Sequence, residues 1–144
     1  MNNDFKPHLN RLMSSGLRAT KQRLMICKAL FGTSKTFHFT IENLKKVIEK
    51  NTRSKISLAT IYNTIHAFKK KGYVKEILIK NNKTYFDTNT KHHHHFYDED
   101  TKILSDIKEK DISLSKIPKA PDGKKVKKIE VTISLANNNH IQEN

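Results

Sequence analysis

Three stretches of the chain repeat apolar side chains at intervals of three and four residues, and each begins with a hydroxyl residue. Such spacing predicts amphipathic helices, and a serine or threonine at the start accepts a hydrogen bond from a free N–H group of the first turn. The predicted N-caps are Thr20, Thr40 and Ser57. Gly32 and Gly72 end the first and third helices, and residues 5–14 predict a short helix before them.

A β-type run follows the third of these helices. Residues 73–79 and 84–86 favour two strands, with a turn at Asn81 and Asn82. Helices followed by a basic hairpin are the order of a winged helix-turn-helix, whose third helix enters the major groove of DNA. We therefore predict a winged-helix DNA-binding domain over residues 1–88.

Residues 89–136 predict a smaller domain of a different kind. Strands are expected at residues 92–97 and from Ile103, with linker or short helix over residues 105–125. Apolar and polar residues alternate over 129–135, which predicts a half-buried strand. Three short strands make too small a core to stand alone, so we expect this domain to pack against a second copy in a homodimer.

The predicted fold class is α+β, an N-terminal winged helix-turn-helix followed by a small α/β dimerisation domain and a flexible tail over residues 137–144. No stretch approaches the ~18–20 apolar residues of a membrane span, and the N-terminus lacks the apolar segment of a secretory signal. The single cysteine, Cys27, excludes an intramolecular disulfide and a Cys-rich zinc site. We expect a cytoplasmic protein without a membrane partner.

The charge is concentrated in the first domain. Residues 1–88 hold 18 Lys and Arg against 5 Asp and Glu, whereas residues 89–144 hold 10 against 9. A basic half beside a balanced half favours a nucleic-acid partner for the first. A lysine-rich background composition would produce the same excess on a merely solvated surface. An anionic membrane is a weaker alternative, because the cations do not gather on one amphipathic terminal helix.

The third predicted helix carries the candidate base contacts. Its first turns hold Thr60, Tyr62 and Asn63; asparagine pairs bidentately with adenine, and threonine or tyrosine contacts a thymine methyl or a phosphate. Ser57 leaves the first N–H groups of the helix directed at a phosphate. The candidate phosphate contacts are Arg18, Lys21, Arg23, Lys69, Lys70, Lys71, Lys80 and Lys83. In the competing interpretation, Tyr62 packs partly in the core and Asn63 is merely exposed.

Four consecutive histidines, His92 to His95, are the candidate ligand site. On a strand, His93 and His95 share one face and the other two share the opposite face. A His-x-His pair binds first-row metal ions, and imidazole also ligates haem iron. The alternative is a solvated polar stretch. Asp87 and His38 are further candidates, although a lone histidine such as His38 is normally a surface residue.

Four motifs together are similar to the signature of the ferric uptake regulator family. They are Gly16 to Arg23, Phe39 to Leu44, Ser57 to Tyr62 and His92 to His95. Each is weak alone, but their order and spacing match the family over about residues 10–135. Within the family, residues 62–64, 83–89 and 115–118 and the His run followed by Phe96 most resemble the iron response regulator branch of alphaproteobacteria.

The resemblance implies a dimeric transcription factor with a metal site near the junction of its domains. His38, Asp87 and His94 match three ligands of that site, and Phe96 stands where the fourth ligand is usually histidine. His93 and His95 match two ligands of a site in the dimerisation domain, whose carboxylate is left open between Glu109 and Asp111. The Cys-x-x-Cys pair of the family's structural zinc is missing, so no structural zinc is expected.

The resemblance also implies what the ligand does. The iron response branch senses haem through its His run, whereas typical members respond to Fe, Mn or Zn ions. We therefore predict an iron- or haem-responsive regulator, a repressor or an activator, of iron and haem metabolism genes, binding a double-stranded DNA operator. The alternatives are a ferrous-, manganous- or zinc-sensing repressor of the same family and a metal- or haem-handling protein without a DNA role. No nucleophile with a nearby base and no Gly-rich phosphate loop is evident, so an enzyme is not expected.

Overall fold

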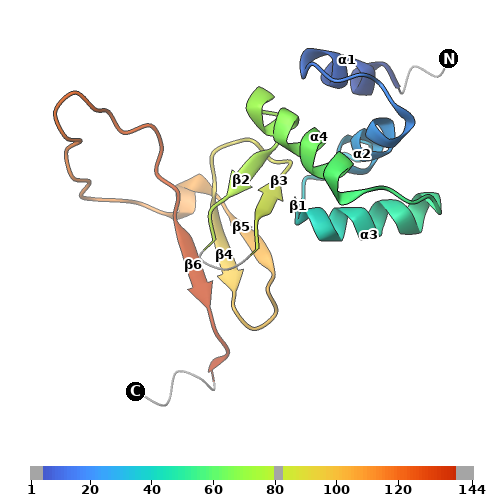
Figure 1. Ribbon diagram of the computed structural model, residues 1–144. Helices are drawn as coiled ribbons and strands as arrows, with labels where there is room; N and C mark the ends of the chain where they lie inside the picture. The colour runs from blue at the N-terminus through green and yellow to red at the C-terminus, as the bar shows by residue number, and fades with distance from the viewer. Residues whose placement is uncertain (1–4, 80–82, 139–144) are drawn as a thin grey trace. The chain divides into compact units, whose positions relative to one another are not determined.

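A computed structural model describes residues 5–79 and 83–138 of the chain. The chain divides into two units, Met1–Thr90 and Lys91–Asn144, here named the N-terminal and C-terminal units (Figure 1). Among the described residues, no helix has the length and apolar character needed to cross a membrane.

The N-terminal unit contains helices whose starts are set by hydroxyl caps. Its helices are α1 (Lys6–Ser14), α2 (Lys21–Phe31), α3 (Ile41–Thr52) and α4 (Leu58–Lys71). The hydroxyl oxygens of Thr20, Thr40 and Ser57 accept hydrogen bonds of 3.3, 3.1 and 3.1 Å from the backbone N–H three residues on. All three predicted N-caps are thus confirmed. Gly72 ends α4 with a φ of 80°, a left-handed conformation that glycine adopts without strain.

A small antiparallel sheet completes the N-terminal unit. Its strands are β1 (His38–Phe39), β2 (Lys75–Ile77) and β3 (Tyr85–Asp87), in the order β1-β3-β2. The β2–β3 pair confirms the predicted hairpin in shorter form, and the predicted turn at Asn81 and Asn82 lies outside the described residues. β1 was not predicted, because two residues show no periodicity and their pairing partner lies about fifty positions away.

One apolar core joins these helices to the sheet. Ile26, Leu30, Ile61, Ile65 and Phe68 are at most 1% exposed and belong to the same cluster as two sheet residues. Those two are Phe39 of β1 and Phe86 of β3, whose rings stack with centroids 5.6 Å apart. The sheet therefore supports the helices from one side of a shared core. The α+β class with an N-terminal winged helix is confirmed.

The C-terminal unit is built on a second small sheet. Its strands are β4 (His94–Asp98), β5 (Leu104–Ile107) and β6 (Thr132–Leu135), in the order β5-β4-β6. β4 pairs antiparallel with β5 and parallel with β6. A 3-10 turn (Glu109–Asp111) follows β5. Predicted strands at residues 92–97 and from Ile103 correspond to β4 and β5, each displaced by one or two residues.

The expectation of a half-buried final strand is wrong for this chain by itself. Every residue of β6 is exposed, and the apolar side chains of Ile133 and Leu135 are still 39% and 38% accessible. The alternation of apolar and polar residues shows that one face of the strand is suited to burial. That face becomes buried only when a second layer of protein packs against it. Within the described residues, this chain places no such layer over β6.

A long irregular segment connects the 3-10 turn to β6. We name residues 112–131 the arm; in Figure 1 it is the loop that runs from orange to red before β6. A tight turn forms its tip, where Lys124 N–H donates to the carbonyl of Pro121 over 3.0 Å and Gly123 has a φ of 75°. Part of the predicted linker of residues 105–125 is thus β5 and a 3-10 turn, and the rest is the arm.

Candidate DNA-binding and metal-binding residues

The exposed face of α4 carries the residues expected to contact bases. Tyr62 is 58% exposed, so it does not pack in the core, and Asn63 beside it is exposed as well. The Tyr62 ring stacks on the ring of His66 one turn later, with centroids 6.1 Å apart and an interplanar angle of 4°. Core positions on the other side of α4, such as Ile61 and Ile65, hold this face outward.

A groove of about 810 Å³ runs beside this face, between α3, α4 and the β2–β3 hairpin. Its charged lining residues are three lysines, Lys46, Lys69 and Lys83, and two glutamates, Glu42 and Glu76, which leaves an excess of positive charge. Lys69 also forms an ion pair with Glu76 of β2, which ties the end of α4 to the hairpin. The groove therefore offers both positive charge and amide and hydroxyl groups to a polyanion. Its polar, uncharged lining residues include Thr40, Asn43, Asn63 and Thr84.

The predicted phosphate contacts are distributed around this surface. Arg18 and Lys21 are exposed at the start of α2, whereas Arg23 is half-buried and its guanidinium donates to the carbonyl of Arg18 over 3.0 Å. Lys70 is exposed near the C-terminal end of α4, beside a smaller cleft shared with Asn63. Arg23 thus holds the loop before α2 in place, and the other three side chains extend toward solvent.

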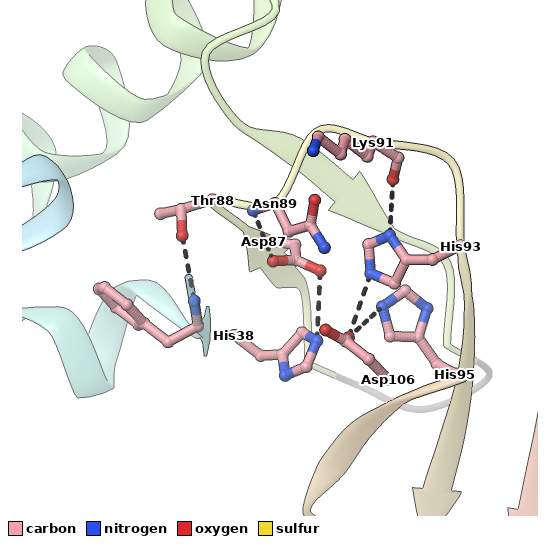
Figure 2. A network of polar contacts seen from close by, with 9 residues as sticks. His38, Asp87, Thr88, Asn89, Lys91, His93, His95 and Asp106 are labelled. Carbon is pink, nitrogen blue, oxygen red and sulfur yellow. Dashed lines mark hydrogen bonds and ion pairs between the residues drawn. The ribbon is translucent and has the colours of Figure 1, made fainter. Parts of the chain in front are cut away.

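Two residues of the N-terminal unit form an acid–imidazole pair in which the carboxylate is buried and the imidazole is half-buried (Figure 2). The β1–β3 register places His38 opposite Asp87, and His38 Nε2 lies 3.2 Å from Asp87 Oδ2. The Asp87 side chain is 1% exposed, and its Oδ1 accepts a 2.8 Å hydrogen bond from Asn89 N–H. Both carboxylate oxygens are therefore held in fixed directions, as a metal ligand requires.

Three residues of the C-terminal unit form a tighter group. His93 Nε2 and His95 Nε2 lie 3.1 and 3.5 Å from the same oxygen, Oδ1 of Asp106, and the two imidazole rings are 4.5 Å apart (Figure 2). Each residue offers one ligand atom within 4.8 Å of the others. The imidazoles are buried, with 7% and 4% of their side chains exposed, so water competes poorly for these atoms.

The tautomer of His93 explains why a cation suits this group. His93 Nδ1 lies 2.6 Å from the carbonyl oxygen of Lys91, which accepts only, so Nδ1 carries the proton. If the ring is otherwise unprotonated, its Nε2 lone pair faces the Asp106 carboxylate, and a positive charge between the two atoms, a metal ion or a proton, makes the contact attractive. Two imidazole nitrogens and one carboxylate oxygen are a donor set that binds first-row divalent ions.

Asp106 was missed at the sequence level, where Glu109 and Asp111 were the candidates for this carboxylate. Glu109 Oε1 instead lies 3.3 Å from Nδ1 of His92, and Asp111 belongs to the 3-10 turn. The missing signal was the strand register, since Asp106 lies directly opposite His95 in the β4–β5 pair.

His94 is on the other face of β4, as strand alternation predicts. Its ring contacts that of His92 at 5.1 Å, and its Nδ1 accepts a 3.0 Å hydrogen bond from Val131 N–H. Burial, followed by the neighbouring His92, lowers the pKa of His94, so the ring is neutral and suited to accept. The C-terminal unit therefore does not bring His94 to His93 and His95.

The sequence pattern of the ferric uptake regulator family matches residues 14–135, which is most of the chain and includes parts of both units. A peroxide-responsive repressor, PerR, of Staphylococcus aureus is 33% identical over 92 residues, which are 64% of this chain and 60% of that protein. The chain thus spans about three fifths of the length of the curated relatives it matches.

Solved structures agree in fold. The ferric uptake regulator of Vibrio cholerae superposes with a TM-score of 0.66 at 20% identity, covering 90% of this chain and 98% of that one. The ferric uptake regulator of Pseudomonas aeruginosa with manganese gives 0.65 at 17% identity, covering 91% and 98%. At such identity the likeness concerns the fold, and it extends over the winged helix and the second sheet alike. Together with the match over residues 14–135, it establishes that the chain belongs to the ferric uptake regulator family.

Proposed function

We propose that this protein is a metal-responsive DNA-binding transcriptional regulator, cytoplasmic and homodimeric, in which residues 1–88 read the operator and residues 89–136 sense the ligand and dimerise. The observation that carries the proposal is the pair of buried imidazoles, His93 and His95, directed at one carboxylate oxygen of Asp106. The family's regulators are not enzymes, in agreement with the expectation from the sequence.

A divalent ion, Fe, Mn or Zn, is the ligand that this donor set favours. His93, His95 and Asp106 supply nitrogen and oxygen donors within reach of one ion. His38 and Asp87 are proposed as further ligands contributed by the N-terminal unit, because they form a second preorganised acid–imidazole pair. His94 is assigned instead to holding β6 beside β4 through its hydrogen bond to Val131.

Haem is the second candidate, from the resemblance to the iron response branch. A porphyrin needs an imidazole with an open side, whereas His93 and His95 are 7% and 4% exposed and both are directed at Asp106. Haem binding would require these contacts to open. We therefore place a divalent ion first, and the similar ferric uptake regulator of Pseudomonas aeruginosa was solved with such an ion, manganese.

The DNA contacts are proposed on α4 and the loop before α2. Tyr62, Asn63 and Thr60 meet base edges, Ser57 presents the start of the helix to a phosphate, and Arg18, Lys21, Arg23 and Lys70 neutralise the backbone. The ligand regulates DNA binding because it binds one conformation of the protein more tightly than another. The equilibrium between the two conformations shifts by that difference in affinity and no more.

The test begins with full-length protein stripped by a chelator. A duplex is selected from a random pool with the Mn(II)-loaded protein, and its Kd is measured by fluorescence anisotropy without ligand and with Mn(II), Fe(II), Zn(II) or haemin. A divalent ion is expected to change the Kd by about 5–150-fold. His93→Ala together with His95→Ala should abolish this change, and Asp111→Ala should not, since Asp111 lies outside the ligand group.

The other outcomes overturn specific parts of the proposal. A response to haemin alone would reject the divalent ion, and a response unchanged by both His38→Ala and Asp87→Asn would remove that pair from the ligands. Absence of DNA binding under every condition would reject the regulator and favour a metal- or haem-handling protein. Lys70→Ala should weaken the binding of selected and random duplexes equally. It should also reduce the slope of log affinity against log salt concentration by about one released ion, whereas a loss that depends on the DNA sequence would reject a phosphate contact for Lys70.

A further inference from the structure

The arm exposes apolar side chains around a groove of its own. Leu114, Ile117 and Val126 are 47%, 50% and 53% exposed. Together with prolines 118 and 121 and with Ile129 they line a groove of about 540 Å³. Proline and the tight turn at Gly123 restrict the backbone, so the groove is already formed before anything fills it. A preformed apolar groove flanked by lysines selects an occupant with an apolar side chain and negative charge.

Such an occupant exists at the other end of the same unit. The turn between β4 and β5 carries three consecutive carboxylates, at residues 98–100, followed by Ile103, whose side chain is 61% exposed. The arm carries six lysines and one aspartate between residues 116 and 128. The two segments are therefore complementary in charge, because the arm is basic and the turn is acidic. They are also complementary in shape, because the turn exposes one apolar side chain and the arm offers one apolar groove.

The topology separates the two segments within one chain. β6 runs parallel to β4, and the arm enters the sheet at Val131, whose carbonyl accepts from His95 N–H near the start of β4. The acidic turn follows Asp98 at the end of β4. The arm and the turn thus lie at opposite ends of the sheet, and a chain cannot bring its own turn to its own arm.

We propose that the arm of one chain docks on the β4–β5 turn of a second copy, with Ile103 in the groove and Lys124 and Lys125 facing Glu99 and Asp100. A two-fold axis perpendicular to the strands exchanges the ends of the sheet, so the contact forms twice, as a self-complementary interface requires. This inference rests on the homodimer of the proposed function and names the surface that forms it. The apolar groove distinguishes this occupant from DNA, whose phosphates offer nothing to fill it.

Charge exchange between two variants of the full chain tests the contact. One variant carries Lys124→Glu and Lys125→Glu in the arm; the other carries Glu99→Lys and Asp100→Asn in the turn. Asn is used at residue 100 because its amide oxygen still accepts from Asn137 N–H, as Asp100 Oδ2 does at 2.9 Å. Each variant alone should have a dimer dissociation constant raised about tenfold or more, measured by sedimentation equilibrium at low salt.

Mixing the two variants should restore dimers, and only heterodimers, because each arm then meets a turn of opposite charge. Native mass spectrometry distinguishes heterodimers from homodimers by mass. Lys108→Glu with Lys110→Glu is the matched control: it makes the same change in charge outside the arm and should dimerise as the unmodified chain does. Circular dichroism of each variant checks that it is folded.

The apolar part of the contact has its own pair of variants. Ile103→Ala should weaken the dimer, whereas Leu78→Ala, which truncates a 76% exposed leucine of the N-terminal unit, should not. Folded arm and turn variants that dimerise as the unmodified chain does, or that fail to restore each other, would overturn the docking. Loss of random-duplex binding in the arm variant with an unchanged dimer would assign the arm to DNA instead. A monomeric unmodified chain would overturn both the docking and the proposed homodimer. The effect of metal on DNA binding is measured in a separate experiment, so the regulatory function is tested independently of the docking.

Discussion

Asp106 is the cross-strand partner of His95, and its Oδ1 lies 3.5 Å from the Nε2 of that histidine. The same oxygen lies 3.1 Å from Nε2 of His93, two residues earlier on β4. The three side chains therefore come from one antiparallel pair of strands. Their spacing is fixed by the sheet, and ordering them for a ligand costs little additional entropy.

This arrangement predicts that Asp106 controls metal affinity. Asp106→Ala removes the only carboxylate of the three-residue group, and we expect the Kd for Mn(II), measured by isothermal titration calorimetry, to rise by at least about tenfold. Asp111→Ala removes a nearby carboxylate that belongs to the 3-10 turn and should leave the Kd unchanged. Equal effects of the two substitutions would show that only general negative charge matters.

A second prediction concerns sequence discrimination by α4. Asn63 is exposed on the same face as Tyr62, where its amide can pair with a base edge. Asn63→Ala should reduce the preference for the selected duplex over single-base variants by about 1–3 kcal/mol at one position, without changing the Kd for random DNA. Competition binding over a panel of single-base variants measures this. A uniform loss across the panel would mean that Asn63 contacts only the backbone.

A third prediction is that the hydrogen bonds of Glu49 make the stability of the N-terminal unit sensitive to acid. Its carboxylate accepts from Lys45 Nζ at 2.7 Å and from Ile56 N–H at 3.0 Å, which fixes the turn between α3 and α4. The Lys45 hydrogen bond, followed by that of Ile56, lowers the pKa of Glu49 below its ordinary 4.5. The stabilisation is present above the unfolded-state pKa and is lost as pH falls through the lower, folded-state value.

Glu49→Gln should therefore have a lower Tm than the unmodified protein at neutral pH, and the difference should shrink as the solution is acidified. Thermal unfolding followed by circular dichroism over a pH series measures both. A Tm difference that stays constant at every pH would show that the lost contacts, and not the charge, account for the effect.

The burial of Cys27 predicts that its thiol is alkylated slowly in the folded protein. The side chain is fully buried in the core of the N-terminal unit, and burial, opposed by Arg11, raises its pKa to about 11. At pH 8 only about one thiol in a thousand is ionised, and alkylation needs the thiolate. Iodoacetamide labelling followed by mass spectrometry should be slow in native buffer and rapid in urea. Prompt native labelling would contradict the burial.

The sequence predicts those parts of the structure that depend on neighbours along the chain. Thr20, Thr40 and Ser57 were identifiable as caps because each bonds within its own helix turn. β1 and Asp106 were not, because a strand pair or a cross-strand ligand depends on a register set elsewhere. The exposure of β6 was not predictable either, because the alternation of its residues is the same whether or not a second layer covers them.

The pairing of β1 with β3 has a consequence for the order in which the protein is made. Phe39 leaves the ribosome about fifty residues ahead of Phe86, the aromatic ring on which it stacks. During that interval α3 and α4 are synthesised, while the apolar cluster that they share with α2 remains open on the side of the missing strand. The nascent chain therefore exposes an incomplete core until its first 87 residues have emerged, and this is the stage at which it most needs a chaperone.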